Sequence, residues 1–422
     1  MPDGSRPLPI AAKPARTTNG WTPPEDCSAP FLPYGRQTIE DDDVHAVAAA
    51  LRADLLTTGP LVEQFERALA DTVGAADAVV CSNGTAALHM AVKAAGVQAG
   101  EAVIVPSITF LATANCARYE GAEVVFADVD PATGLMTAET FAEALSRAGE
   151  RRVKAVLPVH LCGHPVDLPA IRAMADKAGA LVIEDACHAL GTDTPWGQVG
   201  ACARSAMTCF SFHPVKTICT GEGGAVTTNR PDLAARLRRA RNHGATRDAK
   251  DFVVSDLAFD GGAANPWWYE QVDLGWNYRL PDVNCALGIS QLKKLKRFVA
   301  RRRTLASRYD ALLAPLAPLV RPVEGPPGSE AGLHLYAVRI DFAALRKSRR
   351  EVMEALRAKG VGTQVHYIPV HRQPYYRALS PELELPGADG WYAQCLSLPL
   401  FPAMADGDPA RVVETLAEVL RA

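Results

Sequence analysis

The chain has 422 residues, of which 48% are hydrophobic and 22% are charged, and its formal net charge is −3. This composition is typical of a globular protein with a sizeable core, and the length favours one large domain with a smaller appendage. A net charge so close to zero predicts neither a nucleic-acid partner nor a membrane partner. The sequence contains no apolar run of about 18 residues, which is the length that a membrane-spanning helix needs.

The N-terminal stretch differs in composition from the rest of the chain. Residues 1–33 are rich in proline and contain no apolar core of the kind that a signal peptide has. We therefore expect residues 1–33 to form a loosely packed arm ahead of the first domain. In the absence of a recognisable secretion signal, we also expect a cytoplasmic protein.

Short β-branched runs alternate with longer stretches rich in alanine and leucine through the first half of the chain. The apolar runs predict buried strands at 77–82, 102–107, 123–129, 153–160 and 180–185. The stretches between them have helical spacing and most end at glycine, which predicts helices at 85–96, 110–121, 138–149 and 168–179. Such alternation predicts an α/β fold with a parallel sheet, in a large domain that spans residues 34–314 and ends in a long connecting helix.

The pattern changes near residue 315, where prolines become frequent. A strand-like run at 333–341 and a helical pattern at 348–360 come after the proline-rich stretch. These elements predict a second, smaller α/β domain over residues 315–422. We find no internal repeat in the sequence.

The ten cysteines are scattered from Cys27 to Cys395 and form no C-x-x-C pair. This spacing favours small buried hydrophobic side chains over a disulfide framework or a metal site. The nearest approach to a metal signature is "HLCGH", from His160 to His164. Because no second cluster of ligands occurs at a matching spacing, we expect no metal.

The stretch "CSNGTAALHMA", Cys81–Ala91, reads as a strand, a turn with Asn83 and Gly84, and a helix that begins near Thr85. A helix N-terminus after a small-residue turn offers free N–H groups and a positive dipole end, which together suit a phosphate. An ordinary capped helix explains this stretch equally well when it is taken alone. The G-x-G-x-x-G pattern of a dinucleotide site does not occur in it.

Two carboxylates, Glu184 and Asp185, end a predicted buried strand in "VIEDACHALG". Ligands of α/β sheets collect at the carboxyl ends of strands. A carboxylate buried there needs a cationic partner or strong hydrogen bonds to remain ionised. Asp185 is therefore either a partner for the protonated ring nitrogen of a cofactor or a loop acid that caps the next helix.

Lys216 lies between an apolar run and the glycine turn Gly221–Gly224. A lysine without a charged partner in such a wall tends to lose its proton and becomes a nucleophile, although a single lysine is more often a surface residue. Here the lysine occurs together with the phosphate-type turn, Phe110 after a strand, the strand-end Asp185, and Ser211. Pyridoxal phosphate requires these parts: an anion site, a ring stack, an acid for the ring nitrogen and an amine.

The sequence resembles the sugar-nucleotide aminotransferases, a branch of the fold type I pyridoxal-phosphate enzymes, over nearly everything after residue 33. The stretches that carry this resemblance are "PYGRQ", "LLTTGP", "SNGTAALHMA", "ITFLATANCA", "EDACHALG", "SFHPVKTICTGEGG", "LGWNYRLPDVNCALGISQL" and "HYIPVHRQPYY". Within the family, "PYGRQ", "SFHPVK" and "YEQVDLGWNYR" are most similar to the transaminases of pseudaminic acid biosynthesis. That similarity implies a UDP-4-keto-6-deoxy-N-acetylhexosamine as substrate and L-glutamate as amino donor. Another nucleotide-linked keto-sugar remains the alternative.

The resemblance implies a role for each residue around the cofactor ring. Lys216 would form the Schiff base with pyridoxal phosphate and act as the general base, and Asp185 would pair with the ring nitrogen. Phe110 and Cys187 would lie against opposite faces of the ring. His188 would hydrogen-bond the ring hydroxyl group.

The resemblance also implies a homodimer with shared active sites. Gly84, Thr85 and Ser211 would hold the phosphate of the cofactor within one chain, while Asn277 and Arg279 would reach the site of the partner chain. The substrate would meet a further set of residues: Tyr34, Thr57, Thr58, Gly59, His334 and Tyr336.

Two other classes of protein share this fold. A sugar dehydratase of the same branch has histidine in place of the Schiff-base lysine, and Lys216 argues against it. A non-catalytic protein that binds pyridoxal phosphate could have lost the lysine or the acid. Both residues are present, which favours a transaminase.

Overall fold

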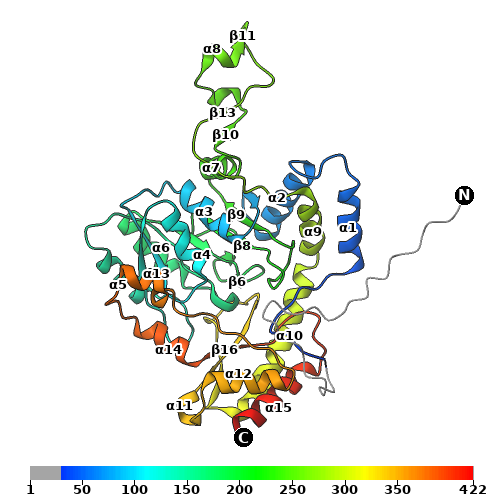
Figure 1. The fold of residues 1–422 in the computed structure, drawn as a ribbon, viewed down its shortest axis with the longest axis vertical. Coiled ribbons are helices and arrows are strands. Elements are labelled where there is room, and N and C mark those ends of the chain that lie inside the picture. The colour runs from blue at the N-terminus through cyan, green and yellow to red at the C-terminus, as the bar shows by residue number, and fades with distance from the viewer. Residues whose placement is uncertain (1–29, 422) are drawn as a thin grey trace, which may run out of the picture.

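The computed structural model describes residues 30–421, so most of the N-terminal arm predicted for residues 1–33 lies outside the described residues. The described chain forms a large α/β body, a smaller C-terminal unit and a protrusion that extends away from the body (Figure 1).

A seven-stranded sheet with the strand order β1-β9-β8-β5-β4-β2-β3 forms the centre of the large body. Its strands are β1 (Asp77–Cys81), β2 (Ala102–Pro106), β3 (Glu123–Ala127), β4 (Val153–Val156), β5 (Leu181–Asp185), β8 (Met207–Ser211) and β9 (Gly224–Thr228). Strand β9 is antiparallel to both of its neighbours, whereas the other neighbouring pairs are parallel. The predicted α/β fold is confirmed, with one antiparallel strand inside a mostly parallel sheet.

Helices pack on both faces of this sheet. They are α2 (Pro60–Val73), α3 (Gly84–Ala94), α4 (Leu111–Tyr119), α5 (Ala138–Ala148), α6 (Leu168–Ala178), α7 (Pro231–Arg241), α9 (Asp282–Leu292) and α10 (Leu295–Leu313). Helix α1 (Asp41–Leu51) packs against α9. The four predicted helices are confirmed as α3 to α6, because their apolar residues recur at helical spacing and glycine or a small residue lies at or near the end of each one.

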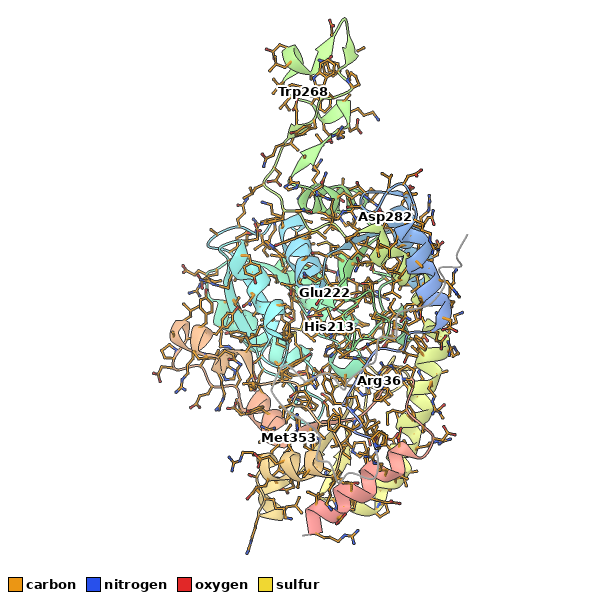
Figure 2. All side chains as sticks on the ribbon, turned by 45° about the vertical axis from the view of Figure 1, so that its right-hand side comes forward. Arg36, His213, Glu222, Trp268, Asp282 and Met353 are labelled. Atoms are coloured by element: carbon orange, nitrogen blue, oxygen red, sulfur yellow. The ribbon has the colours of Figure 1, made fainter. Side chains whose placement is uncertain are left out.

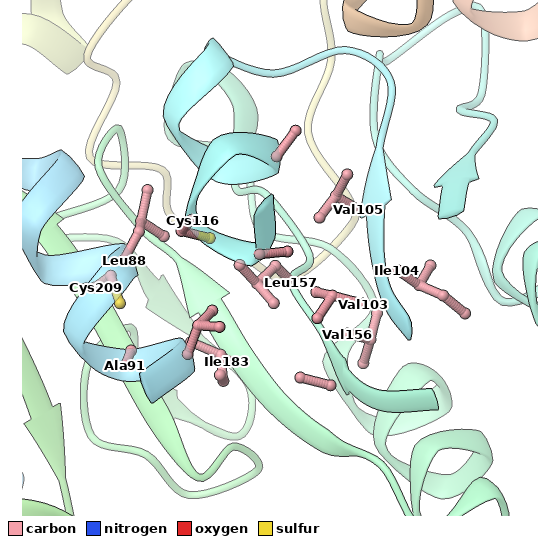
Figure 3. Packing of buried hydrophobic residues seen from close by; sticks show 14 of the residues in the cluster. Leu88, Ala91, Val103, Ile104, Val105, Cys116, Val156, Leu157, Ile183 and Cys209 are labelled. Atoms are coloured by element: carbon pink, nitrogen blue, oxygen red, sulfur yellow. The ribbon is translucent and has the colours of Figure 1, made fainter. Parts of the chain in front are cut away.

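The buried side chains form two clusters on opposite faces of the sheet, because successive residues of a strand point to opposite sides. In β1, Val79 and Cys81 belong to the first cluster, while Ala78 and Val80 belong to the second. Figure 3 shows part of the first cluster, with Leu88 of α3 beside the sheet. Helices α2, α9 and α10 contribute to the second cluster. The sheet is therefore covered on both faces, which leaves its strand ends to form a site.

The smaller unit has a three-stranded antiparallel sheet of β14 (Val320–Pro322), β15 (Tyr336–Ile340) and β16 (Cys395–Leu398). Its helices are α11 (Phe342–Leu345), α12 (Arg349–Ala358) and α15 (Asp408–Arg421). Helix α10 joins the two parts, since its C-terminal half, including Tyr309, packs into the core of the smaller unit. Helices α13 (Pro374–Leu379) and α14 (Pro386–Gln394) instead place Tyr376 and Trp391 in the core of the large domain. The stretch after residue 315 is thus divided between two cores.

Residues 245–271, which we call the protrusion, extend from the body beyond α7 (Figure 1). Its elements are β10 (Ala245–Thr246), η2 (Ala249–Asp251), α8 (Ser255–Ala258), β11 (Phe259–Asp260), β12 (Ala263–Ala264) and β13 (Glu270–Gln271). Large apolar side chains are exposed on it, including Val253, Leu257 and Trp267, whose side chain is 69% exposed. The remaining short elements are β6 (Asp193–Thr194), β7 (Gly197–Gln198), η1 (Leu161–Gly163), η3 (Ala314–Leu316) and η4 (Val370–Arg372).

Candidate active site

A cavity of about 680 Å³ opens where β1, β5 and β8 end and α3 begins. The structure brings many of the predicted site residues into its wall: Tyr34, Gly84, Thr85, Phe110, Asp185, Cys187, His188, Ser211, Lys216 and His334. These residues come from segments far apart in the sequence, so their convergence is a property of the fold. His213 and Glu222, which are labelled near the middle of the view in Figure 2, also line this cavity, and both are exposed.

The turn between β1 and α3 forms a cradle at one end of the cavity. Asn83 caps α3, since its side-chain oxygen accepts a hydrogen bond of 2.8 Å from the backbone N–H of Ala86. A Cβ atom on Gly84 would lie 2.8 Å from Cβ of Ser211 and 3.4 Å from Sγ of Cys187, so only glycine fits this approach. The helix N-terminus and the Ser211 hydroxyl thus face a common space that suits an anion.

The glycine turn after Lys216 has a structural reason at Gly224. A Cβ atom at that position would overlap the backbone carbonyl of Asn83. Glycine therefore allows β9 to pass directly beside the turn that forms the cradle.

Asp185 is buried at the end of β5, with 4% of its surface exposed. Its Oδ2 accepts a hydrogen bond of 2.6 Å from the Thr113 hydroxyl, and its Oδ1 accepts one of 3.1 Å from the backbone N–H of Cys187. These two donors fix the carboxylate in the cavity wall. Thr113 is a site residue that the sequence patterns did not predict, although it lies one helical turn after Phe110.

The neighbouring Glu184 has different partners. It accepts hydrogen bonds from Nε2 of His160 at 2.7 Å, from the Ser205 hydroxyl at 2.5 Å and from the Thr208 hydroxyl at 2.7 Å. Burial alone would raise the pKa of Glu184, but these hydrogen bonds outweigh it and hold the pKa below its usual value. His160 of the "HLCGH" stretch is therefore a partner of Glu184.

Within residues 30–421 we find no group of three metal-ligating side chains.

Lys216 lies in the cavity wall just after β8, and its side chain is only partly exposed. Loss of solvation lowers the pKa of its ammonium group, while the nearby Cys187 and Asp185 partly oppose that effect. The lowered pKa increases the fraction of neutral amine. Lys216 thus places an amine of lowered pKa in the same cavity wall as the fixed carboxylate of Asp185.

A group of aromatic and imidazole rings closes another side of the cavity. Nε2 of His188 lies 2.9 Å from the hydroxyl oxygen of Tyr367, and the His188 and His334 ring centroids are 4.5 Å apart. His366 also lines the cavity. The stretch "HYIPVH" pointed to the family, but neither His366 nor Tyr367 was predicted to lie in the site.

The structure does not bring all predicted residues to this cavity. Tyr336 is buried in the smaller unit, where its ring stacks on Tyr309 with centroids 4.6 Å apart and its hydroxyl donates to Asp310 at 2.6 Å. It does not line the cavity. Apolar alternation in β15 turns this side chain into the core.

The remaining predicted residues lie at the surface around a second cavity of about 860 Å³. Thr58, Gly59 and Arg279 line it. Thr57 and Asn277 are exposed and lie within two residues of these lining residues in the sequence. The buried Asp282 holds the turn in place, since its carboxylate accepts hydrogen bonds from the backbone N–H groups of Gly59 at 2.8 Å and Leu61 at 3.0 Å.

This second cavity, which we call the arginine cavity, lies between the body and the protrusion. Its arginine side chains are Arg238, Arg239, Arg241, Arg247 and Arg279. Several of them are paired: Arg241 contacts Glu66 at 2.5 Å, and Arg279 donates to the Asn242 side chain at 2.6 Å. Tyr269 of the protrusion also lines it, with the Arg247 guanidinium 5.7 Å from the ring centroid.

Comparisons of the sequence and of the structure with known proteins identify the same class of relatives. Residues 37–417 match the DegT/DnrJ/EryC1/StrS aminotransferase family. Helicobacter pylori PseC, described as an aminotransferase involved in the biosynthesis of pseudoaminic acid, is 26% identical with a TM-score of 0.83, covering 93% of this chain and 99% of that one. The PMP form of the putative sugar aminotransferase Spr1654 from Streptococcus pneumoniae is 25% identical with a TM-score of 0.82, covering 92% and 99%. DesI, solved in the presence of its TDP-sugar product, is 32% identical with a TM-score of 0.79 and 93% of both chains covered.

Among residues 30–421, no helix is both long enough and apolar enough to cross a membrane. The match to the family extends over most of the sequence, and the similar solved structures share the fold over 92–93% of this chain. The chain therefore belongs to the DegT/DnrJ/EryC1/StrS aminotransferase family and is a pyridoxal-phosphate-dependent sugar aminotransferase of fold type I.

Proposed function

We propose that the enzyme transfers an amino group from L-glutamate to the C4 ketone of a nucleotide-linked 4-keto-6-deoxy sugar, a UDP-linked N-acetylhexosamine of the pseudaminic acid type. The main support for aminotransferase chemistry is that Lys216, Asp185 and the Gly84 cradle all line one cavity. The similarity to PseC supports the choice of sugar.

The residues in the cavity fit pyridoxal phosphate. The cradle between α3 and Ser211 leaves room for an anion only because residue 84 has no Cβ atom, and we assign the phosphate to Gly84, Thr85 and Ser211. Asp185 would pair with the ring nitrogen, and Phe110 and Cys187 would lie against the ring faces. When bound, the cofactor supplies an electron sink for breaking the bond between hydrogen and the carbon next to the amine.

Lys216 then has two tasks in this proposal. Its amine would hold the cofactor covalently, and the lowered pKa favours the neutral form that this bond requires. Lys216 would also act as the general base that accepts a proton from the α-carbon of L-glutamate. In the second half of the reaction, Lys216 delivers a proton to the sugar carbon that carries the new amine, which sets the stereochemistry at that carbon.

Asp185 assists by keeping a negative charge beside the ring nitrogen. The Thr113 hydroxyl and the Cys187 backbone N–H hold this carboxylate at a fixed place. A charge fixed in advance stabilises a developing charge without reorganisation during the reaction.

We assign the substrate contacts within one chain to Tyr34 and His334. Nδ1 of His334 is buried in the cavity wall and has no hydrogen-bonding partner among the described residues. Burial, with a contribution from Lys216, holds the pKa of His334 well below its usual value, so its ring is neutral. A neutral imidazole donates from one ring nitrogen and accepts at the other, which suits a sugar hydroxyl group.

A homodimer with shared sites is suggested by where the other residues lie. Asn277, Arg279 and the turn Thr57–Gly59 lie at the surface, outside the cavity that contains Lys216. A second copy of the chain could bring them to that cavity, and we propose that it does.

The second candidate substrate is a dTDP- or GDP-linked keto-sugar with its ketone at C3 or C4. The similarity to DesI, solved with its TDP-sugar product, favours it specifically. Turnover of the purified enzyme with UDP-, dTDP- and GDP-linked keto-sugars, with L-glutamate as donor, distinguishes the candidates. A preference for the UDP-linked 4-keto sugar by tenfold or more in kcat/KM, about 1.4 kcal/mol, supports the proposal, and the reverse preference contradicts it.

An absorbance spectrum distinguishes a transaminase from a sugar dehydratase and from a non-catalytic protein that binds pyridoxal phosphate. The purified protein is expected to absorb near 420 nm, roughly the wavelength of a lysine-linked cofactor, and to lose that band on addition of L-glutamate. A band that L-glutamate leaves unchanged would point to a binding protein or to a different amino donor.

A further inference from the structure

Both ring nitrogens of His188 are engaged by other parts of the protein. The backbone N–H of Cys162 donates a hydrogen bond of 3.3 Å to Nδ1 of His188. A backbone amide can only donate, so Nδ1 carries no proton. Burial, together with Lys216 and His366, holds the pKa of His188 well below its usual value, so the ring is neutral. The single ring proton therefore lies on Nε2.

The proton on Nε2 of His188 points to Tyr367. The Tyr367 hydroxyl oxygen lies 2.9 Å from Nε2 and accepts this hydrogen bond. Burial raises the pKa of Tyr367 well above its usual value, so the phenol keeps its own proton. Among the described residues, His188 is the only hydrogen-bonding partner of this hydroxyl. The phenol hydrogen is thus left available for an acceptor in the cavity.

The chain segment that contains Tyr367 is held at the cavity wall by contacts of the preceding residue, His366. The Trp391 indole N–H donates a 3.0 Å hydrogen bond to the carbonyl of His366, and Nδ1 of His366 lies 2.8 Å from the Ser397 hydroxyl. The Tyr367 ring centroid is 6.1 Å from that of Phe110, the residue that we place against the cofactor ring. The hydroxyl is therefore fixed by His188 on one side and by its own chain segment on the other.

We propose that Tyr367, oriented by His188, donates the hydrogen bond to the ring oxygen of pyridoxal phosphate, and that His188 is a positioning residue. This inference rests on the proposed function, because it requires the cofactor in this cavity. It replaces the expectation that His188 itself bonds the ring hydroxyl group. The ring oxygen is an acceptor when deprotonated, and a phenol that keeps its proton can donate to it.

The experiment measures cofactor binding and the visible spectrum for wild type, Tyr367→Phe, His188→Ala and the double variant. We expect Tyr367→Phe to shift the visible band and to raise the dissociation constant of pyridoxal phosphate roughly tenfold, the loss typical of one hydrogen bond to a charged group. Because His188 acts through Tyr367, the double variant should bind no more weakly than the weaker of the two single variants.

Tyr376→Phe is the matched control. It removes another buried hydroxyl, which donates to Asn115 at 2.7 Å and lies outside the cavity. Its spectrum and cofactor affinity should equal those of wild type. Thermal unfolding of each cofactor-free variant shows whether the fold is intact.

Two results would overturn the inference. The first is a Tyr367→Phe protein with the wild-type spectrum and affinity, and the second is a double variant in which the two losses add. If wild type binds cofactor and responds to L-glutamate while either result is obtained, the proposed function stands and only the role of Tyr367 fails. A wild type that binds no cofactor overturns both.

Discussion

The cavity around Lys216 and the arginine cavity beside the protrusion differ in how completely one chain builds them. Around Lys216, the buried carboxylate of Asp185 has two donors, and both nitrogens of His188 have partners. At the arginine cavity, the predicted residues Thr58 and Arg279 line an open surface, and Asn277 is exposed.

The difference arises from the cost of burying polar groups. A buried carboxylate or imidazole must find its partners within the chain, which fixes the geometry before any ligand binds. Exposed groups are satisfied by water and can wait for a second chain. The apolar side chains of the protrusion, which include Trp267 at 69% exposure, lie in the same outer region. Figure 2 shows Trp268 far out on the protrusion, away from the body that contains the cavity around Lys216.

The largest expected effect is at Lys216. Lys216→Ala removes the amine to which we assign cofactor attachment and proton transfer, so turnover should fall below about a hundredth of the wild-type value. A steady-state assay with L-glutamate and the preferred sugar measures it. Lys177→Ala, at an exposed position on α6, is the control and should retain full activity. Substantial activity of the Lys216 variant would remove this cavity from catalysis.

Asp185→Asn should reduce turnover by about two to four orders of magnitude, because the amide cannot supply the negative charge beside the ring nitrogen. The cradle at Gly84 is unaffected, so the variant should still bind pyridoxal phosphate, which equilibrium dialysis measures. Nearly unchanged turnover would mean that Asp185 only caps the chain segment after β5.

Mixing two inactive variants tests whether the surface residues serve the neighbouring chain. After subunit exchange between Lys216→Ala and Asn277→Ala, a heterodimer has one site with an intact lysine and an intact partner asparagine. If half of the dimers are mixed, about a quarter of the wild-type activity should return. Each variant exchanged with itself is the control.

This test depends on two conditions that are measured first. Asn277→Ala alone must be severely impaired, and native mass spectrometry must show that mixed dimers form. Mixed dimers without recovered activity would place Asn277 in the site of its own chain or outside catalysis.

The smallest effect is expected at Tyr336, which the structure places in the core of the smaller unit. Tyr336→Phe removes the hydrogen bond to Asp310 and should cost about 1 kcal/mol of unfolding free energy, while kcat and KM stay within about twofold of wild type. Urea unfolding and steady-state kinetics measure the two quantities. A large rise in KM would show that Tyr336 acts on the substrate after all.

Much of the large domain could be predicted from local patterns. Strands β1 to β5 and helices α3 to α6 are indicated by apolar periodicity and by the residues that end each element. Lys216, Asp185 and the turn at Gly84 could be singled out because they occur together with Phe110 and Ser211 in one sequence, although each has an ordinary explanation when taken alone. Each of these signals is contained in a few neighbouring residues, so no knowledge of the fold is needed to read it.

The tertiary structure decided which side chains meet. Thr113 reaches Asp185 across 72 positions of sequence, and Tyr367 reaches His188 across 179. Periodicity carries no information about contacts at such separations, because any buried threonine or tyrosine fits the same local pattern. The resemblance to the family implied that Tyr336 contacts the substrate, whereas the alternation of β15 within its sheet turns that side chain into the core, against Tyr309.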